Sequence, residues 1–153
     1  MATAEQVSKK LKAHTETVAP GLPFHLNATH QPGDGVWQGD LGIEVVSKVP
    51  KDYVLVVKPS DVDRQLVPES GQGSHHRLRS LEGVKLYRPA KWGESDTDLR
   101  GPCIVFDRPN AIVHEPGHDK PHGTVHVDEP MTVLCRYQRN LDAETKQERR
   151  SRD

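Results

Sequence analysis

Short runs of alternating apolar and polar residues fill the middle of the chain. The cleanest run spans Met131–Tyr137, where every second side chain, beginning with Met131, is suited to face a protein interior. A period of two residues is typical of a half-buried β-strand. Turn sequences rich in Gly, Pro, Asn and Asp separate further runs, which lie at 43–49, 53–57, 65–67, 76–81, 84–87, 103–106, 111–114 and 124–127. Many short strands joined by turns predict a mainly β protein, either a compact antiparallel β-sandwich or a small barrel.

The two ends of the chain have a different composition. Near the N-terminus, Ala4–Val18 has a thin apolar stripe that predicts a short helix, and the residues after it, rich in Pro, Gly, Asn and Asp, predict an extended arm. Near the C-terminus, Ala143–Arg152 is predicted to be a helix with arginines in its last turn. We therefore expect an N-terminal helix and extended arm at 1–38, a β domain at 39–139 and a charged helical tail at 140–153.

Composition and charge limit the classes of partner. Hydrophobic residues make up 33% of the 153 residues and aromatic residues 5%, so part of the chain is expected to lie outside the core. The 21 basic and 22 acidic residues give a formal net charge of −1, which argues against nucleic acid or an anionic membrane as partner. No apolar run approaches the roughly 20 residues that span a bilayer, and the N-terminus lacks the apolar region of a signal peptide. We expect a soluble protein that is made in the cytoplasm and either stays there or leaves within an assembled particle such as a virion.

The segment at 113–127 contains the most concentrated candidate chemistry, four histidines at a spacing of four residues: His114, His118, His122 and His126. Two prolines and two glycines interrupt this segment, so it cannot be a helix and is predicted to be a loop that leads into a short strand at 124–127. A second polar cluster at 71–77 contains His75 and His76. In a β fold, these two clusters can lie on neighbouring strands.

Histidines gathered from two strands and their loops are typical of metal sites in cupin-like β-barrels. The candidate ligands are His76 on one strand and three histidines of the other cluster, and the candidate metals are zinc, iron and manganese. The alternative is that these histidines only form hydrogen bonds in loops, with no cofactor bound. The four candidate ligands are His76, His114, His118 and His122.

The sequence predicts no catalytic site. Ser74 and His75 are adjacent, but neighbouring residues of a strand point to opposite faces and cannot form a nucleophile–base pair. A nucleophile elbow of the form G-x-S-x-G is absent from the sequence. The Gly-x-Gly patterns at 33–35 and 71–73 are too short to form a phosphate-binding loop.

Three aromatic residues are candidates for binding a partner protein. Phe24 and Trp37 lie in the predicted arm, and Trp92 is the only aromatic residue of a predicted loop at 88–101. A large aromatic side chain in a polar segment usually packs on another surface. We expect Phe24, Trp37 and Trp92 to be partner-binding residues.

Four sequence motifs follow one another between Gln38 and Asp142. They are a Gly-Asp-hydrophobic strand ending in Val-Pro at 39–50, a Gly-Ser-His-His-Arg turn at 73–77, a His-x-x-x-His-Gly loop at 118–123 and a final Gln-Arg-Asn-Leu-Asp segment at 138–142. This order resembles a family of small, largely uncharacterised bacterial and phage proteins with a G-E-x-x-G-H-x-H-R-type turn and an H-x-x-H-G loop. The chain departs from the family pattern at Ser74, which replaces the first histidine of the turn. The resemblance implies no particular activity.

Two hypotheses about function remain open. The first is a non-enzymatic structural or interaction protein, such as a decoration or stabilising protein of a phage capsid, which docks through its terminal arms onto a protein partner, either a capsid shell or other copies of itself. The alternative is a cupin-like histidine metal-binding protein or enzyme. A nucleic-acid-binding module is disfavoured by the charge.

Overall fold

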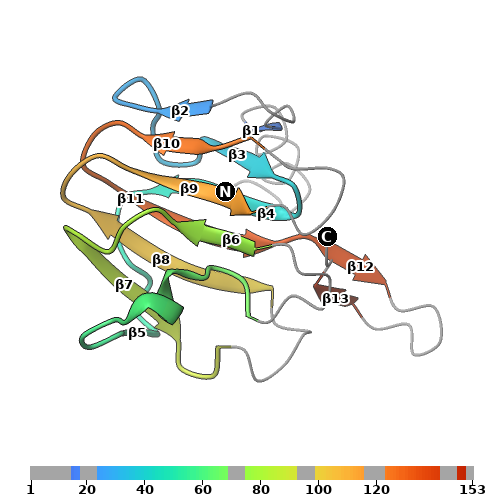
Figure 1. Ribbon diagram of the computed structural model, residues 1–153. Coiled ribbons are helices and arrows are strands. Elements are labelled where there is room, and N and C mark those ends of the chain that lie inside the picture. The colour runs from blue at the N-terminus through green and yellow to red at the C-terminus, as the bar shows by residue number, and fades with distance from the viewer. Residues whose placement is uncertain are drawn as a thin grey trace.

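Two β-sheets packed face to face form this protein, as the computed structural model shows (Figure 1). The structure describes residues 15–17, 24–68, 75–92, 99–115, 123–141 and 148–150. The strands of each sheet are arranged in an open row and do not close into a ring. The predicted mainly β fold is therefore confirmed, and of the two predicted architectures it is the sandwich that forms.

The larger sheet contains seven strands in the order β1-β3-β4-β11-β8-β7-β5. Every neighbouring pair is antiparallel except β1 and β3, which are parallel. In this order along the sheet, the strands are Thr15–Thr17, Gly35–Gln38, Leu41–Val46, Met131–Tyr137, Arg100–Phe106, Val84–Pro89 and Tyr53–Leu55.

The smaller sheet contains four strands in the order β2-β10-β9-β6, which are Phe24–Leu26, Val125–Val127, Asn110–Glu115 and His75–Leu78. A short 3-10 helix, η1 (Asp61–Arg64), leads to the free side of β6. There the Leu66 amide donates a hydrogen bond of 2.8 Å to the His76 carbonyl. Strands β12 (Arg139–Leu141) and β13 (Glu148–Arg150) form a separate antiparallel pair.

Apolar side chains from both sheets fill the space between them. Along β11, Val133, Cys135 and Tyr137 are buried, as the alternation in the sequence predicts. Further side chains with at most 1% exposure include nine from seven other strands and the segment after η1: Leu26, Val36, Leu41, Ile43, Leu66, Leu78, Leu86, Ile104 and Ile112. None of the helices that the structure describes is long and apolar enough to cross a membrane.

The termini differ from the sequence-based expectation. The structure describes residues 15–17 of the predicted helix Ala4–Val18 and residues 148–150 of the predicted helix Ala143–Arg152, and both segments are strands. The helix prediction is wrong for these residues, and the remainder of both predicted helices lies outside the described residues. A helix with so thin an apolar stripe gains little from packing, whereas a neighbouring strand supplies backbone hydrogen-bond partners.

The predicted extended arm contains two strands of the sandwich. Strand β2 pairs with β10 in the smaller sheet and β3 pairs with β4 in the larger one. Leu26 and Val36, one from each of these strands, are fully buried in the core. The β domain therefore includes residues that precede position 39. Each strand has only three or four residues, too few for the period of two to stand out from the surrounding Pro and Gly.

Candidate functional site

Four polar side chains are buried between the two sheets at one end of the sandwich, and we call them the polar cluster: Gln38, Asp40, His76 and His114. Gln38 ends β3 and Asp40 lies in the turn to β4, both in the larger sheet. His76 of β6 and His114 of β9 are directly opposite each other in the smaller sheet. Alternation along each strand places the two histidines on the same inward face as Leu78 and Ile112.

The side-chain amide of Gln38 links the two sheets. Its Nε2 donates hydrogen bonds of 2.9 Å to the carbonyl oxygens of Ile112 and Gly123. Both of these partners are acceptors only, so the amide nitrogen must face them and Oε1 must face the other way. Oε1 lies 2.8 Å from Nδ1 of His76. Because Oε1 is an acceptor only, His76 Nδ1 carries a hydrogen and donates it to Gln38.

This hydrogen bond determines what the other nitrogen of His76 can do. His76 Nε2 lies 3.4 Å from Asp40 Oδ1, and the two side chains are 2% and 8% exposed. In a neutral ring with hydrogen on Nδ1, the Nε2 lone pair would face a carboxylate and be repelled by it. A cation at this position, either a proton on Nε2 or a metal ion, would turn the contact into an attraction.

The separation of these atoms also fits metal coordination. Two ligands of a tetrahedral zinc ion, each bonded at about 2.0–2.1 Å, lie about 3.3 Å apart. The His114 ring is 4.3 Å from the His76 ring between centroids, at an interplanar angle of 42°. In metal sites a histidine ligand usually donates its second ring N–H to a neighbouring acceptor, and Gln38 has this position relative to His76.

The structure brings together two of the four histidines predicted as metal ligands, His76 and His114. The other two, His118 and His122, lie outside the described residues. Among the residues that the structure describes, no three His, Cys, Asp or Glu side chains are arranged so that they could enclose a metal ion. Sequence reasoning missed Gln38 and Asp40, because a Gln-Gly-Asp turn gives no sign that its side chains will be buried.

The three aromatic residues predicted to bind a partner contact their own chain. Trp92 donates a hydrogen bond of 2.7 Å to the Tyr137 hydroxyl, and the Arg88 guanidinium stacks over its ring at 4.1 Å. The Trp37 ring covers Gly42 so closely that a Cβ there would lie 2.9 Å from it. Phe24 packs against the core. These contacts explain why large aromatics stand in polar segments, and partner binding by them stays a prediction.

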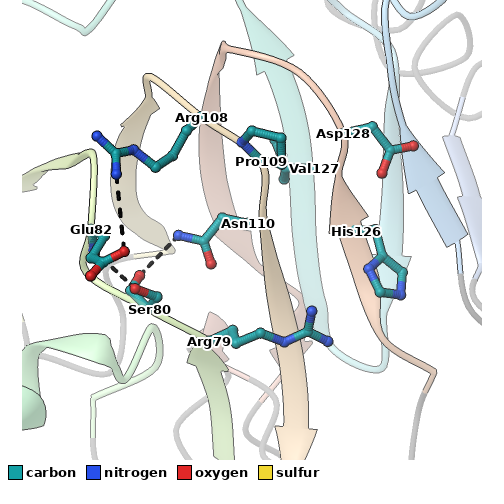
Figure 2. A pocket seen from close by; sticks show the side chains of 9 residues that line it. All are labelled: Arg79, Ser80, Glu82, Arg108, Pro109, Asn110, His126, Val127 and Asp128. Carbon is teal, nitrogen blue, oxygen red and sulfur yellow. Dashed lines mark hydrogen bonds and ion pairs between the residues drawn. The ribbon is translucent and has the colours of Figure 1, made fainter.

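A shallow pocket of about 240 Å³ opens between the β6–β7 turn, the β8–β9 turn and β10 (Figure 2). Both signs of charge line it, with Arg79 and Arg108 among the basic groups and Glu82 and Asp128 among the acidic ones. Burial, followed by the nearby His25 and Arg79, lowers the pKa of His126 at its edge. The mixture of charges gives the pocket no preference for a cation or an anion.

The exposed large hydrophobic side chains of the described chain fall within one short segment, and we call them the 54–62 patch: Val54, Leu55, Val57 and Val62, with exposures of 56%, 45%, 76% and 71%. Val54 and Leu55 belong to β5, and Val62 to η1. The predicted strand at 53–57 is therefore confirmed over Tyr53–Leu55, and Val54 and Leu55 are exposed because β5 lies at the edge of its sheet.

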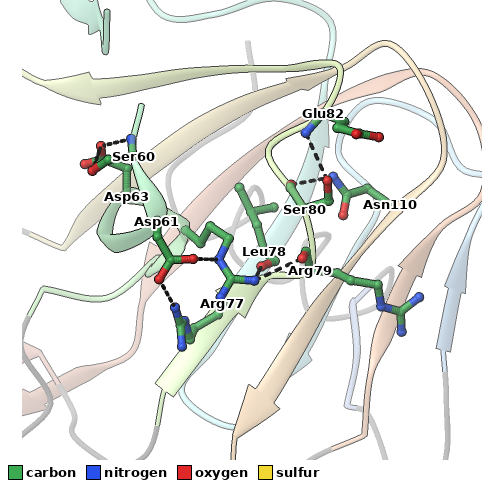
Figure 3. Close-up of polar contacts among 10 residues, drawn as sticks. Ser60, Asp61, Asp63, Arg77, Leu78, Arg79, Ser80, Glu82 and Asn110 are labelled. Carbon is green, nitrogen blue, oxygen red and sulfur yellow. Dashed lines mark hydrogen bonds and ion pairs between the residues drawn. The ribbon is translucent and has the colours of Figure 1, made fainter. Parts of the chain in front are cut away.

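Ion pairs hold the 3-10 helix that carries Val62 (Figure 3). Asp61 contacts Arg64 at 2.9 Å and Arg77 of β6 at 3.3 Å, and Arg64 donates to the carbonyl of Leu78. A hydrogen bond from the Ser60 amide, helped by Arg88, lowers the pKa of Asp63. The patch is thus presented on a segment that is fixed to both sheets.

Comparisons with protein-family models, with curated proteins and with solved structures find no match to this chain. The resemblance to the small bacterial and phage proteins stays a prediction from the motifs between Gln38 and Asp142.

Proposed function

We propose that this protein is a non-enzymatic structural or interaction protein that binds a protein partner through the 54–62 patch. The observation that carries the proposal is the location of the exposed large hydrophobic residues, which in the described chain are confined to this one segment. Single exposed hydrophobic residues are common on protein surfaces, whereas a concentration of them usually marks an interaction site. A partner that covers these side chains removes apolar surface from water, which stabilises the complex.

The docking surface differs from the one that the sequence suggests. Strands β2 and β3 of the predicted arm are part of the sandwich, and Phe24, Trp37 and Trp92 contact their own chain. The four side chains of the 54–62 patch are instead exposed to solvent. The finer form of the proposal, a decoration or stabilising protein of a phage capsid, rests on the motif resemblance alone.

The two thiols are consistent with a role without nucleophilic catalysis. Cys103 and Cys135 are fully buried and are not joined in a disulfide. Burial raises the pKa of the Cys103 thiol to about 11. Burial also raises the pKa of Cys135, which lies beside Cys103 on the neighbouring strand. Neither side chain is a thiolate at neutral pH, and the thiolate is the reactive form.

The test is the native mass of the chain in an extract of the cells that produce it. We expect the wild-type chain in a species larger than a monomer, and the double variant Val57→Ser/Val62→Ser as a monomer with an unchanged melting temperature, because both side chains are mostly in water. A matched control, Lys48→Ser/Lys51→Ser, replaces two other surface residues and should leave the large species intact. A wild-type chain that is monomeric in the extract would contradict the proposal.

A second candidate function, metal binding, is favoured by one observation. His76 Nε2 faces the Asp40 carboxylate at 3.4 Å while Gln38 holds the hydrogen on Nδ1, so a cation between the two groups would be stabilised. Asp40 and His76 would hold the ion together with further ligands from the sequence-based prediction, which are His114, His118 and His122, since no three described side chains enclose an ion by themselves. Zinc, iron and manganese are the candidates.

Elemental analysis of the chain purified from its source, with thermal unfolding on the same sample, tests this candidate. Zinc at about 100 times its dissociation constant would stabilise the folded state by about 2.7 kcal/mol, which raises the melting temperature by about 5–10 °C. We expect this increase in the wild type and in the control His25→Gln, and its loss in His76→Gln, each variant compared with its own metal-free form. A chain without bound metal, whose melting temperature does not respond to zinc, iron or manganese, would exclude this function.

A further inference from the structure

We propose that the occupant of the 54–62 patch is a second copy of this chain, and that the two β5 strands pair antiparallel across a two-fold axis to continue the larger sheet. This inference rests on the proposed function and names its partner. Strand β5 is the last strand of the sheet, next to β7 only. Two such edges that meet would convert two seven-stranded sheets into one.

The backbone of β5 has hydrogen-bonding groups directed outward. The Val56 amide donates a hydrogen bond of 2.8 Å to the Leu86 carbonyl on β7, so this amide points into the sheet. Along an antiparallel strand these groups alternate in direction. The N–H and C=O of Leu55 therefore point away from β7, toward the open edge. Outward groups of this kind are a template for another strand, and here they are those of Leu55, because the amide of Tyr53 is bonded to the Pro50 carbonyl at 3.2 Å.

The order of the side chains favours an antiparallel copy of the same strand. With Leu55 opposite Leu55 of the second copy, the outward N–H and C=O of each would bond to the other, and Tyr53 would lie opposite Val57. Asp52 stands before this segment and Lys58 after it. Antiparallel alignment places the acidic end of one strand beside the basic end of the other, whereas parallel alignment places like charges together.

The edge also lacks the features that usually prevent such pairing. Edge strands are commonly protected by proline, by an inward-pointing charge or by a covering segment. Strand β5 has no proline, and Val54, Leu55 and the following Val57 are exposed. Lys58 has a positive φ of 52° and turns the chain away, which limits the pairing to a short segment. We therefore expect an association that depends on protein concentration.

Sedimentation of the purified full chain over a range of concentrations tests the inference. We expect a monomer–dimer equilibrium in the wild type. Leu55→Asp should lower the association constant at least about tenfold, because the change occurs twice in a two-fold dimer and places two carboxylates together. Leu55→Pro should act similarly, because it removes the outward N–H without removing a hydrogen bond to β7.

Ala28→Asp is the matched control, since it places a carboxylate at an exposed position outside the 54–62 patch, and it should leave the association constant within about twofold of the wild type. An equal loss in Ala28→Asp would overturn pairing through the strand edge. A purified chain that stays monomeric while the extract contains a larger species sensitive to Val57→Ser/Val62→Ser would overturn the second copy as partner and leave the proposed function standing. A monomer in both experiments would overturn both.

Discussion

Replacing Gln38 by leucine is expected to lower the free energy of unfolding by about 3–5 kcal/mol. The Gln38 amide makes three hydrogen bonds, to the carbonyls of Ile112 and Gly123 and to His76 Nδ1, and the side chain is fully buried. Leucine has a similar volume but no polar atoms. Each polar group that it leaves buried without its partner costs about 1–3 kcal/mol, partly relieved by small movements of the strands.

Denaturant unfolding followed by circular dichroism measures this effect. Gln65→Leu is the matched control. It removes the same kind of side-chain amide, which here bonds only to the carbonyl of Val67, two residues away. We expect the control to cost about 1 kcal/mol or less. If the two variants were equally stable, Gln38 would not hold the sheets together, and the hydrogen on His76 Nδ1 would not be fixed by Gln38.

The strands with the clearest patterns were predictable from the sequence. Met131–Tyr137 has an apolar residue at every second position, and Val133, Cys135 and Tyr137 are buried in the core, while Leu134 is buried on the opposite face. The two histidine clusters were expected to be able to meet in a β fold, and the structure brings His76 and His114 together on neighbouring strands. For Met131–Tyr137 the signal is the period of two residues, which follows from the geometry of a strand.

Other features depend on which segments become neighbours, and no local pattern encodes that. Gln38 and Asp40 are buried because the smaller sheet covers the end of β3, and nothing in the residues around them indicates it. In the same way, an apolar run of four or five residues fits both a central and an edge strand, so the exposure of Val54 and Leu55 could not be predicted from Tyr53–Val57.

The two candidate functions would use different regions of the molecule. Metal binding would use the polar cluster, which lies between the sheets where β6 begins and β9 ends. Partner binding would use β5 and η1, at the free edge of the larger sheet. Because different residues form the two regions, a variant in one should leave the other intact, and both functions can be tested in the same protein.

Replacing Gly101 by valine is expected to destabilise the protein by about 3 kcal/mol, the second-largest effect that we predict. Gly101 lies in β8 at a β-bulge, where the register with β11 shifts between Leu134 and Arg136. A Cβ at this position would lie 2.8 Å from the carbonyl oxygen of Cys135, so the backbones of two central strands would have to separate. Glycine in a strand often marks such a close approach.

Gly33→Val is the control for this change. Apart from its neighbours in the chain, no atom lies within 4 Å of the position of a Cβ on Gly33, but its φ of +100° is unfavourable for other residues. The expected cost is therefore only the backbone strain, about 1–2 kcal/mol. Denaturant unfolding of both variants separates the steric effect from the conformational one, and an equal cost in the two would contradict the steric argument.

Tyr53 supplies a local measure of the same displacement. Its hydroxyl donates a hydrogen bond of 2.8 Å to the Gly101 carbonyl, and burial raises its pKa above the usual range. The unfolded chain loses this proton near pH 10, so the wild type should lose stability as the pH rises above about 10.

If valine moves β8, Tyr53 becomes more accessible and its pKa falls toward the ordinary value, which ultraviolet difference absorbance detects. Gly33→Val should leave the Tyr53 titration unchanged, because Gly33 lies in a turn that does not contact this tyrosine. A wild-type Tyr53 titration in Gly101→Val would mean that the sheet accommodates the side chain without moving β8.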